Sequence, residues 1–147
     1  MKGIKMVYTE FNPSRNFLVR VEHNSDLIQF ITELAEKEKI VVATLTAVGA
    51  LKQAKLGFYN QEKHEYQEIR IGSPHEIACC VGNISIKDGR PFVHAHAVLA
   101  DKNGNTKAGH LLEGTVFAAE VHLRELKGAA LERKYDDVTG LSLWETK

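Results

Sequence analysis

The stretch PFVHAHAVLADKNGNTKAGHLLEG, residues 91–114, decides the fold that we expect for this chain. In its first part, residues 92, 94, 96 and 98 alternate with residues 93, 95, 97 and 99, which is the period of a β-strand whose successive side chains point to opposite faces. The segment DKNGN that follows is typical of a hairpin turn, since Gly104 suits the left-handed position of a three-residue loop. The stretch therefore predicts two antiparallel strands joined by a tight turn.

The register of this hairpin determines whether its three histidines share one face. If the loop consists of residues 102–104, His110 lies directly opposite His96, and His94 shares their face. Opposed Cβ atoms are then about 4.5–5.5 Å apart and diagonal ones about 7–8 Å, so the three imidazoles can converge on one ion. A two-residue loop at 103–104 would shift the pairing by one residue and move His110 to the other face. The metal site thus depends on the turn type.

Three imidazoles in this arrangement predict a divalent metal ion, most simply zinc. Neutral imidazole is a favoured nitrogen donor for Zn²⁺, and three protein ligands plus an open position are typical of catalytic zinc. Because only neutral imidazole binds the ion, we expect occupancy to fall as the pH drops through roughly 6 to 5. The alternative is that His94 and His96 are partly exposed and only hydrogen-bonded, with His110 near the turn.

The sequence of the rest of the chain predicts several strands and one helix. Residues 25–39, SDLIQFITELAEKEK, have apolar side chains at helical spacing, and Ser25 or Asp26 can cap the start. Alternating or β-branched runs predict further strands at 17–22, 40–51, 55–59, 66–71 and 77–86. We therefore expect an α/β fold of the α+β type, with a mainly antiparallel mixed sheet of about seven strands and one principal flanking helix.

Length and composition bound the possible functions. The chain has 147 residues with 44% hydrophobic content, which fits a single domain over residues 1–147. Its 19 basic and 19 acidic residues cancel, so the charge pattern of a tight nucleic-acid binder is missing and such a partner is not expected. The N-terminus MKGIKMVYTE has no apolar export signal, and no stretch of 18 apolar residues occurs, so we expect neither export nor a membrane partner.

The cysteines agree with that expectation. Cys79 and Cys80 are the only two and are adjacent in sequence, so a disulfide between them would be strained. They lie in an apolar run and are expected in the core. A reducing cytoplasm is the compartment that fits this usage.

The segment TVFAAEVHLREL, residues 115–126, predicts a strand beside the hairpin. Strict alternation would place Phe117 on the face of Ala119, and Glu120 on the face of His122. Glu120 could accept the free N–H of a metal-bound imidazole, and so could Glu113 at the end of the hairpin. These two carboxylates are the candidate general bases.

The order of these segments resembles a known family. Gly89-Arg90-Pro91 leads into HAHAVLADKNGNTKAGHLLEGTVFAAEV, and the chain closes with ERKYDDVTGLSLW, residues 132–144. Together with Arg15, the helix and the Thr-Ala-Val-Gly at 46–49, this is similar to the plants-and-prokaryotes-conserved (PPC) domain in its prokaryotic stand-alone form. The resemblance implies a PPC-domain fold, assembly as a homotrimer, and a metal ion at His94, His96 and His110.

The resemblance also carries a DNA-binding label. In plants the domain is fused to Arg-Gly-Arg-Pro arms that enter the minor groove, and no such arm is found here. The plant partner-binding segment corresponds in position to residues 65–71, but the sequence of these residues differs from it. Two function classes follow: a zinc-dependent site that binds or hydrolyses a small molecule, and, as the alternative, a DNA-associated or protein-interaction module without catalysis.

Overall fold

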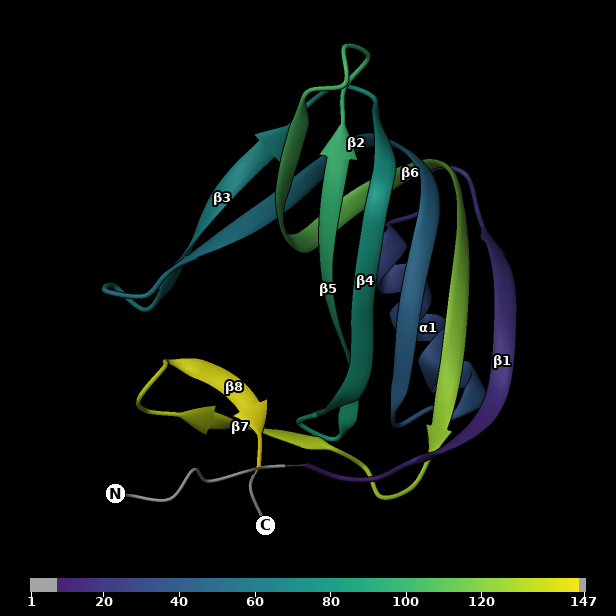
Figure 1. Cartoon of the computed structure of the whole chain (residues 1–147), viewed down its shortest axis with the longest axis vertical. Coiled ribbons are helices and arrows are strands. Elements are labelled where there is room, and N and C mark those ends of the chain that lie inside the picture. The colour runs from purple at the N-terminus through teal and green to yellow at the C-terminus, as the bar shows by residue number, and fades with distance from the viewer. Residues whose placement is uncertain (1–7, 146–147) are drawn as a thin grey trace.

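The computed structural model describes residues 8–145. The expectation that the chain has no apolar export signal rests partly on residues 1–7, which lie outside the described residues. Two long strands, β2 (Ala43–Asn60) and β6 (Thr106–Lys127), organise the fold (Figure 1). The elements in chain order are β1 (Asn12–Val21), α1 (Leu27–Glu38), β2 (Ala43–Asn60), β3 (Glu65–Ile71), β4 (His75–Lys87), β5 (Arg90–Ala100), β6 (Thr106–Lys127), β7 (Glu132–Asp136) and β8 (Leu141–Trp144). One helix on a large sheet confirms the expected α+β fold.

The sheet has the order β3-β2-β6-β5-β4-β7-β8, with β1 paired to β6 and β2 paired also to β4. Strands β2, β6, β5 and β4 therefore form a closed ring of pairings. This closure is possible because β6 changes partner along its length: residues 106–110 pair with β5, and the following residues pair with β2. The pairings are antiparallel except that of β4 with β7, which is parallel, so the sheet is mixed as predicted.

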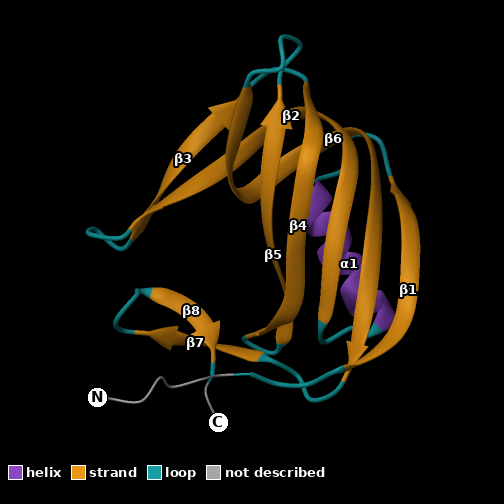
Figure 2. Cartoon of the chain, viewed as in Figure 1, coloured by secondary structure: helices purple, strands orange, loops and turns teal. Residues whose placement is uncertain are grey.

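The helix is capped by one of the two residues that the sequence offers, Asp26 rather than Ser25, and covers one face of the sheet. Asp26 is the N-cap, and its Oδ1 accepts a hydrogen bond from the backbone N of Gln29 at 2.9 Å. Its Oδ2 accepts one from the backbone N of Gly114 at 2.7 Å, which ties the start of the helix to β6. The helix buries Leu27, Ile31 and Ala35. In Figure 2 it lies behind the strands, so the face turned to the viewer carries no helix.

Three sequence predictions about strands need correction, and bulges explain each. The strands expected at 40–51 and 55–59 are one strand, β2, which bends where its register shifts near Gly49 and Leu51. Bulges bend a strand without ending it, so a break in the apolar pattern there does not end the strand.

The other two corrections concern which face a side chain takes. Cys79 is exposed and only Cys80 is buried, because the register of β4 against β5 shifts between Ile77 and Cys79. Phe117 is 59% exposed while Val116 is fully buried, because the pairing of β2 with β6 shifts between residues 50 and 51. An extra residue in a strand reverses the alternation beyond it.

The residue pairings show which side chains share the open face, the face opposite the helix. One cross-strand row runs through Leu18, His122, Thr46, Val81, His96 and His110. The adjacent row of Val19, Val121, Ala47, Cys80 and Ala97 points toward the helix and includes the buried Val121 and Ala97. The histidine hairpin therefore presents its imidazoles on the open face. Over residues 8–145, no helix is long and apolar enough to cross a membrane.

Candidate metal site

The turn between β5 and β6 has the three-residue form on which the site depends. The backbone N of Asp101 donates to the carbonyl oxygen of Asn105 at 2.9 Å, and Gly104 has φ +81°. The Asp101 carboxylate accepts hydrogen bonds from the backbone N of Asn103 and of Asn105. These bonds fix the loop, and the side-chain hydrogen bond from Asn105 is the main reason that the pKa of Asp101 is lowered. The predicted register of the hairpin is confirmed.

The register brings the three histidines together. His96 is paired directly with His110, and the pairing of β5 with β6 ends there because β6 turns to β2. The ring centroids of His94 and His96 are 5.2 Å apart, those of His94 and His110 5.2 Å, and those of His96 and His110 5.5 Å. One nitrogen from each ring lies within 4.8 Å of the others, which is close enough to hold one metal ion.

The nitrogen donors of this cluster fit a metal ion. His110 is partly buried, and its Nδ1 is buried without a hydrogen-bond partner among the described residues. A buried polar atom without a protein partner is uncommon, and this nitrogen is available to bind an ion, a water or a ligand. His96 is exposed, so the cluster is open to solvent on one side.

The electrostatics of the cluster keep its buried imidazoles neutral. Burial lowers the pKa of His110 to about 4, and the neighbouring His94, His96 and Arg133 contribute in the same direction. Burial also lowers the pKa of His94. Only a neutral imidazole has a free lone pair for a metal, so both rings are ready to bind one at pH 7.

Residues that the sequence analysis missed surround the cluster. The ring of Tyr66, on β3, lies 5.3 Å from the ring of His110. Asn83, on β4, is the direct cross-strand partner of His94, and its Oδ1 accepts a hydrogen bond from Arg133 of β7 at 3.2 Å. The Asp-Gly turn at 88–89 could have placed Asn83, because a two-residue hairpin loop fixes its register. No local pattern could have placed Tyr66 or Arg133.

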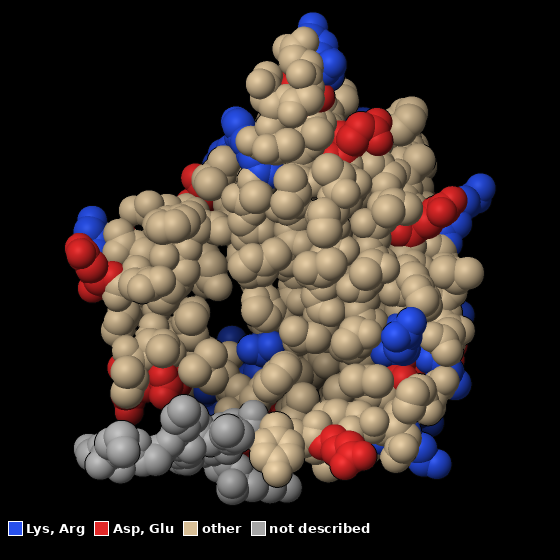
Figure 3. Space-filling view, in the orientation of Figure 1, with Lys and Arg blue, Asp and Glu red and all other residues tan. Residues whose placement is uncertain are grey.

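Two hairpins meet at the edge of this region. The Tyr59 hydroxyl, on β2, donates to the carbonyl oxygen of Thr139, between β7 and β8, at 2.7 Å. His64 stacks on the Tyr59 ring, and Gly140 lies so close to both residues that a Cβ there would collide. The space-filling view shows a hollow between the two hairpins and the main sheet, with basic atoms at its lower edge (Figure 3).

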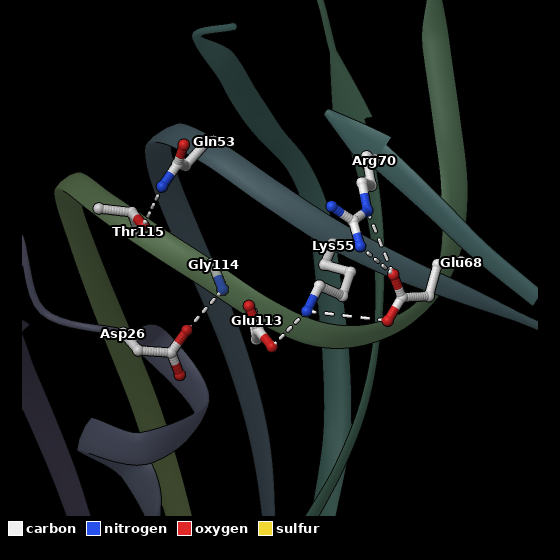
Figure 4. A network of polar contacts seen from close by, with 8 residues as sticks. All are labelled: Asp26, Gln53, Lys55, Glu68, Arg70, Glu113, Gly114 and Thr115. Carbon is white, nitrogen blue, oxygen red and sulfur yellow. Dashed lines mark hydrogen bonds and ion pairs between the residues drawn. The ribbon is translucent and has the colours of Figure 1, made fainter. Parts of the chain in front are cut away.

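The two candidate general bases lie apart from the imidazoles. Glu113 accepts a hydrogen bond from Lys55 Nζ at 2.6 Å, in a network that includes Glu68 and Arg70 (Figure 4). Glu120 lies on the open face with His122, and strands β2 and β4 separate that position from β5 in the sheet. Within residues 8–145, no hydrogen bond joins either carboxylate to the three histidines.

Comparison with known proteins identifies the family. The Plants and Prokaryotes Conserved (PCC) domain matches residues 8–127, which include the helix, the hairpin and all three histidines. The chain belongs to this family. The PCC match ends before β7, so Arg133 lies beyond it.

Solved structures agree with the assignment to the PCC family. A plant- and prokaryote-conserved protein from Pyrococcus horikoshii is 42% identical, with a TM-score of 0.92 over 97% of this chain and 99% of that chain. A metal-containing protein from Archaeoglobus fulgidus is 40% identical, with a TM-score of 0.91 and the same coverage. The fold of this PCC protein is thus that of its prokaryotic relatives.

More distant similarities are of two kinds. Two bifunctional GlmU proteins from Synechococcus strains are 31% and 30% identical over 83% and 86% of this chain. The PCC protein spans about a fifth of their length, 18% and 20%. An acetolactate decarboxylase from Bacillus subtilis shares the fold alone, at 13% identity and a TM-score of 0.54 over 86% of this chain and 58% of that chain.

Proposed function

We propose that this PCC protein binds a divalent metal ion, zinc in the first instance, through His94, His96 and His110. The observation that carries the proposal is the convergence of three imidazole nitrogens within 4.8 Å, one ring of which has a buried nitrogen without a partner among the described residues. Nitrogen donors favour Zn²⁺ over the oxygen-seeking Ca²⁺ and Mg²⁺. The description of the Archaeoglobus fulgidus relative as a metal-containing protein supports the proposal.

The site has the composition of a reactive centre. Three protein ligands leave a coordination position for water or a ligand, and His96 on the exposed side gives access to it. A metal bound there would polarise a carbonyl group or lower the pKa of a bound water. We therefore propose binding or hydrolysis of a small molecule as the function, without a role for Glu113 or Glu120, which lie apart from the imidazoles.

Metal analysis tests the site directly. We expect purified protein, loaded with zinc and freed of excess, to hold one ion per chain and to melt at a higher temperature than metal-free protein. His96→Ala should lose most of the metal, since two imidazoles remain. His122→Ala is the matched control, because it removes a histidine from the same face that Thr46 and Val81 separate from His96 in the cross-strand row.

The result that contradicts the proposal is equally clear. If wild-type protein holds no stoichiometric metal and zinc stabilises it no more than it stabilises His96→Ala, the histidines have a structural role only. Anomalous scattering at metal absorption edges would identify the ion in crystals.

The alternative function is a DNA-associated or protein-interaction module without catalysis. A relative from Ralstonia eutropha described as a candidate DNA-binding protein is 25% identical, with a TM-score of 0.79 over 88% of this chain and 90% of that chain. Against direct DNA binding stands the zero net charge, which offers few phosphate contacts. Metal content and the salt dependence of DNA retention separate the two functions.

We also propose that the protein assembles as a homotrimer through its open face. Apolar side chains are exposed there in the row that ends at His96 and His110: Leu18 is 85% exposed and Val81 50%. Much of this face is uncharged in Figure 3, with most of the charged groups toward its edges. Exposed apolar surface of this kind is typical of an interface with another protein.

A further inference from the structure

Arg133 is held firmly in place by neutral groups. Its Nε donates to Ser85 Oγ at 2.7 Å, its Nη1 to the carbonyl oxygen of Ser142 at 3.0 Å, and its Nη2 to Asn83 Oδ1 at 3.2 Å. Its guanidinium carbon also lies over two aromatic rings, 5.2 Å from the centroid of Phe92 and 5.6 Å from that of Trp144. The side chain is partly buried, and Ser85 beneath it is fully buried. These three hydrogen bonds and two ring contacts fix the guanidinium in one position.

That position is beside the candidate metal site. Asn83 is the cross-strand partner of His94, and Ser85 is the cross-strand partner of Phe92. Cross-strand partners point to the same face, so Asn83, Ser85, Phe92 and His94 form one patch on the open face. Because Arg133 contacts three members of this patch, its guanidinium lies on the patch to which the imidazole of His94 also belongs.

The positive charge of Arg133 has no acidic partner. None of the ion pairs among residues 8–145 involves this residue, and its three hydrogen bonds go to two side-chain oxygens and one carbonyl oxygen that carry no net charge. A guanidinium has five N–H donors, so two N–H groups, one on each terminal nitrogen, are left to bind something else. A partly buried cation without a counter-charge is costly unless an anion completes it.

We propose that Arg133 binds the oxyanion group of a small molecule, a carboxylate or a phosphate, while another oxygen of that molecule reaches the metal held by the three histidines. The proposal rests on the proposed metal site and names the class of its ligand. Two N–H groups on a planar guanidinium match the two oxygens of such a group, and the contacts with Phe92 and Trp144 help to orient the guanidinium. Arg133 is a ligand-positioning residue in this scheme.

The chain provides its own probe for this binding. Trp144 is the only tryptophan, and the Arg133 guanidinium lies over its ring. An anion that pairs with Arg133 changes the electrostatic surroundings of the indole, so tryptophan fluorescence should respond. Glycolate and methyl phosphate are suitable small probes for the two sources of the oxyanion, and glycolamide is a neutral analogue of glycolate. Calorimetry on the same samples measures binding independently of the fluorophore.

With zinc-loaded protein we expect glycolate or methyl phosphate to bind and glycolamide to bind at least tenfold more weakly. In Arg133→Gln the dissociation constant of the bound anion should rise at least tenfold while the zinc content stays at the wild-type value. Arg133→Lys, which keeps the charge but loses the fork of donors, should lie between the two. Lys134→Gln is the matched control: it removes one positive charge from the next residue, which is exposed and paired with Glu145, and should bind as the wild type does.

The proposal is overturned if Arg133→Gln binds the anion as tightly as Lys134→Gln does, or if glycolamide binds as well as glycolate. It is also overturned if neither anion binds at tens of millimolar. Should Arg133→Gln fail to fold, the comparison of glycolate with glycolamide on wild-type protein decides. A protein without stoichiometric zinc whose anion binding still depends on Arg133 would refute the proposed metal site and leave the anion site standing.

Discussion

At the scale of single residues, His110 combines two properties that are rarely found together. Its ring is partly buried against β2 and β3, and its Nδ1 has no hydrogen-bond partner among the described residues. Burial lowers its pKa to about 4, so the native protein resists protonating it. In a metal-free protein this resistance costs stability whenever the unfolded chain would take up the proton.

The first prediction concerns that cost. An unfolded histidine has a pKa of about 6.5, so between about pH 6.5 and 4 the unfolded chain binds a proton at this position that the native protein does not. Metal-free protein should therefore lose stability to urea as the pH falls through this range, and the loss should be smaller in His110→Gln. Urea titrations at pH 7 and pH 5 measure the difference, and equal losses in the two proteins would contradict the prediction.

The proposed zinc site and anion site are also arguments about single residues. His96→Ala tests metal binding, and Arg133→Gln tests anion binding. The two substitutions should be separable, because one removes a ligand of the ion and the other a donor beside it. Zinc content should change only in the first variant, and anion affinity with retained zinc only in the second.

At the scale of elements, the bend of β2 allows one strand to pair with three neighbouring strands. Its first part pairs with β4 and β6, and its last part pairs with β3, which carries Tyr66 to the ring of His110. Gly49 lies where the register shifts, with φ +132°. A Cβ at this position would collide with the backbone of Ala118 and Ala119 on β6.

Gly49→Ala should therefore destabilise the fold by at least about 2 kcal/mol, because both the backbone conformation and the close approach to β6 exclude a side chain. Gly72→Ala is the matched control. Gly72 has no positive φ, and no atom lies within 4 Å of the place where its Cβ would be. Chemical denaturation of both variants measures the effect, and equal stabilities would show that β2 tolerates the side chain.

The sequence predicted the helix and strands better than it predicted which face of the sheet each side chain takes. The helix, a cap at Ser25 or Asp26, and the histidine hairpin were predictable because each depends on neighbouring residues: a capping side chain, a 3.6-residue period, a glycine at the left-handed position. The exposure of Cys79 and Phe117 was not, because a bulge depends on how two distant strands fit together.

At the scale of the whole molecule, the open face is the feature that remains to be explained. The single helix covers the opposite face, which leaves apolar side chains such as Leu18, Val48 and Val81 exposed. The candidate metal site lies at the end of the row of residues that contains Leu18 and Val81. Assembly through this face would bury those side chains next to the site.

Light scattering checks the proposed trimer. Wild-type protein at micromolar concentrations should have three times the mass of one chain, and Leu18→Glu combined with Val48→Glu should reduce it to that of a monomer, because charges on a buried apolar surface oppose association. The control pair Lys52→Glu and Gln53→Glu changes charge on exposed residues of β2 and should keep the wild-type mass. A monomeric wild type would contradict the trimer.

By itself the sequence determined the local parts of this protein: a tight turn between residues 101 and 105 and, for the three-residue form that the structure has, the register that brings His94, His96 and His110 together. A hairpin register depends only on its loop, which is why it can be counted from the residues. Only the tertiary structure decided that β4 and β7 run parallel and that Arg133 lies beside His94. Parallel pairing joins segments far apart in sequence, and no turn or period between them records which residues will meet.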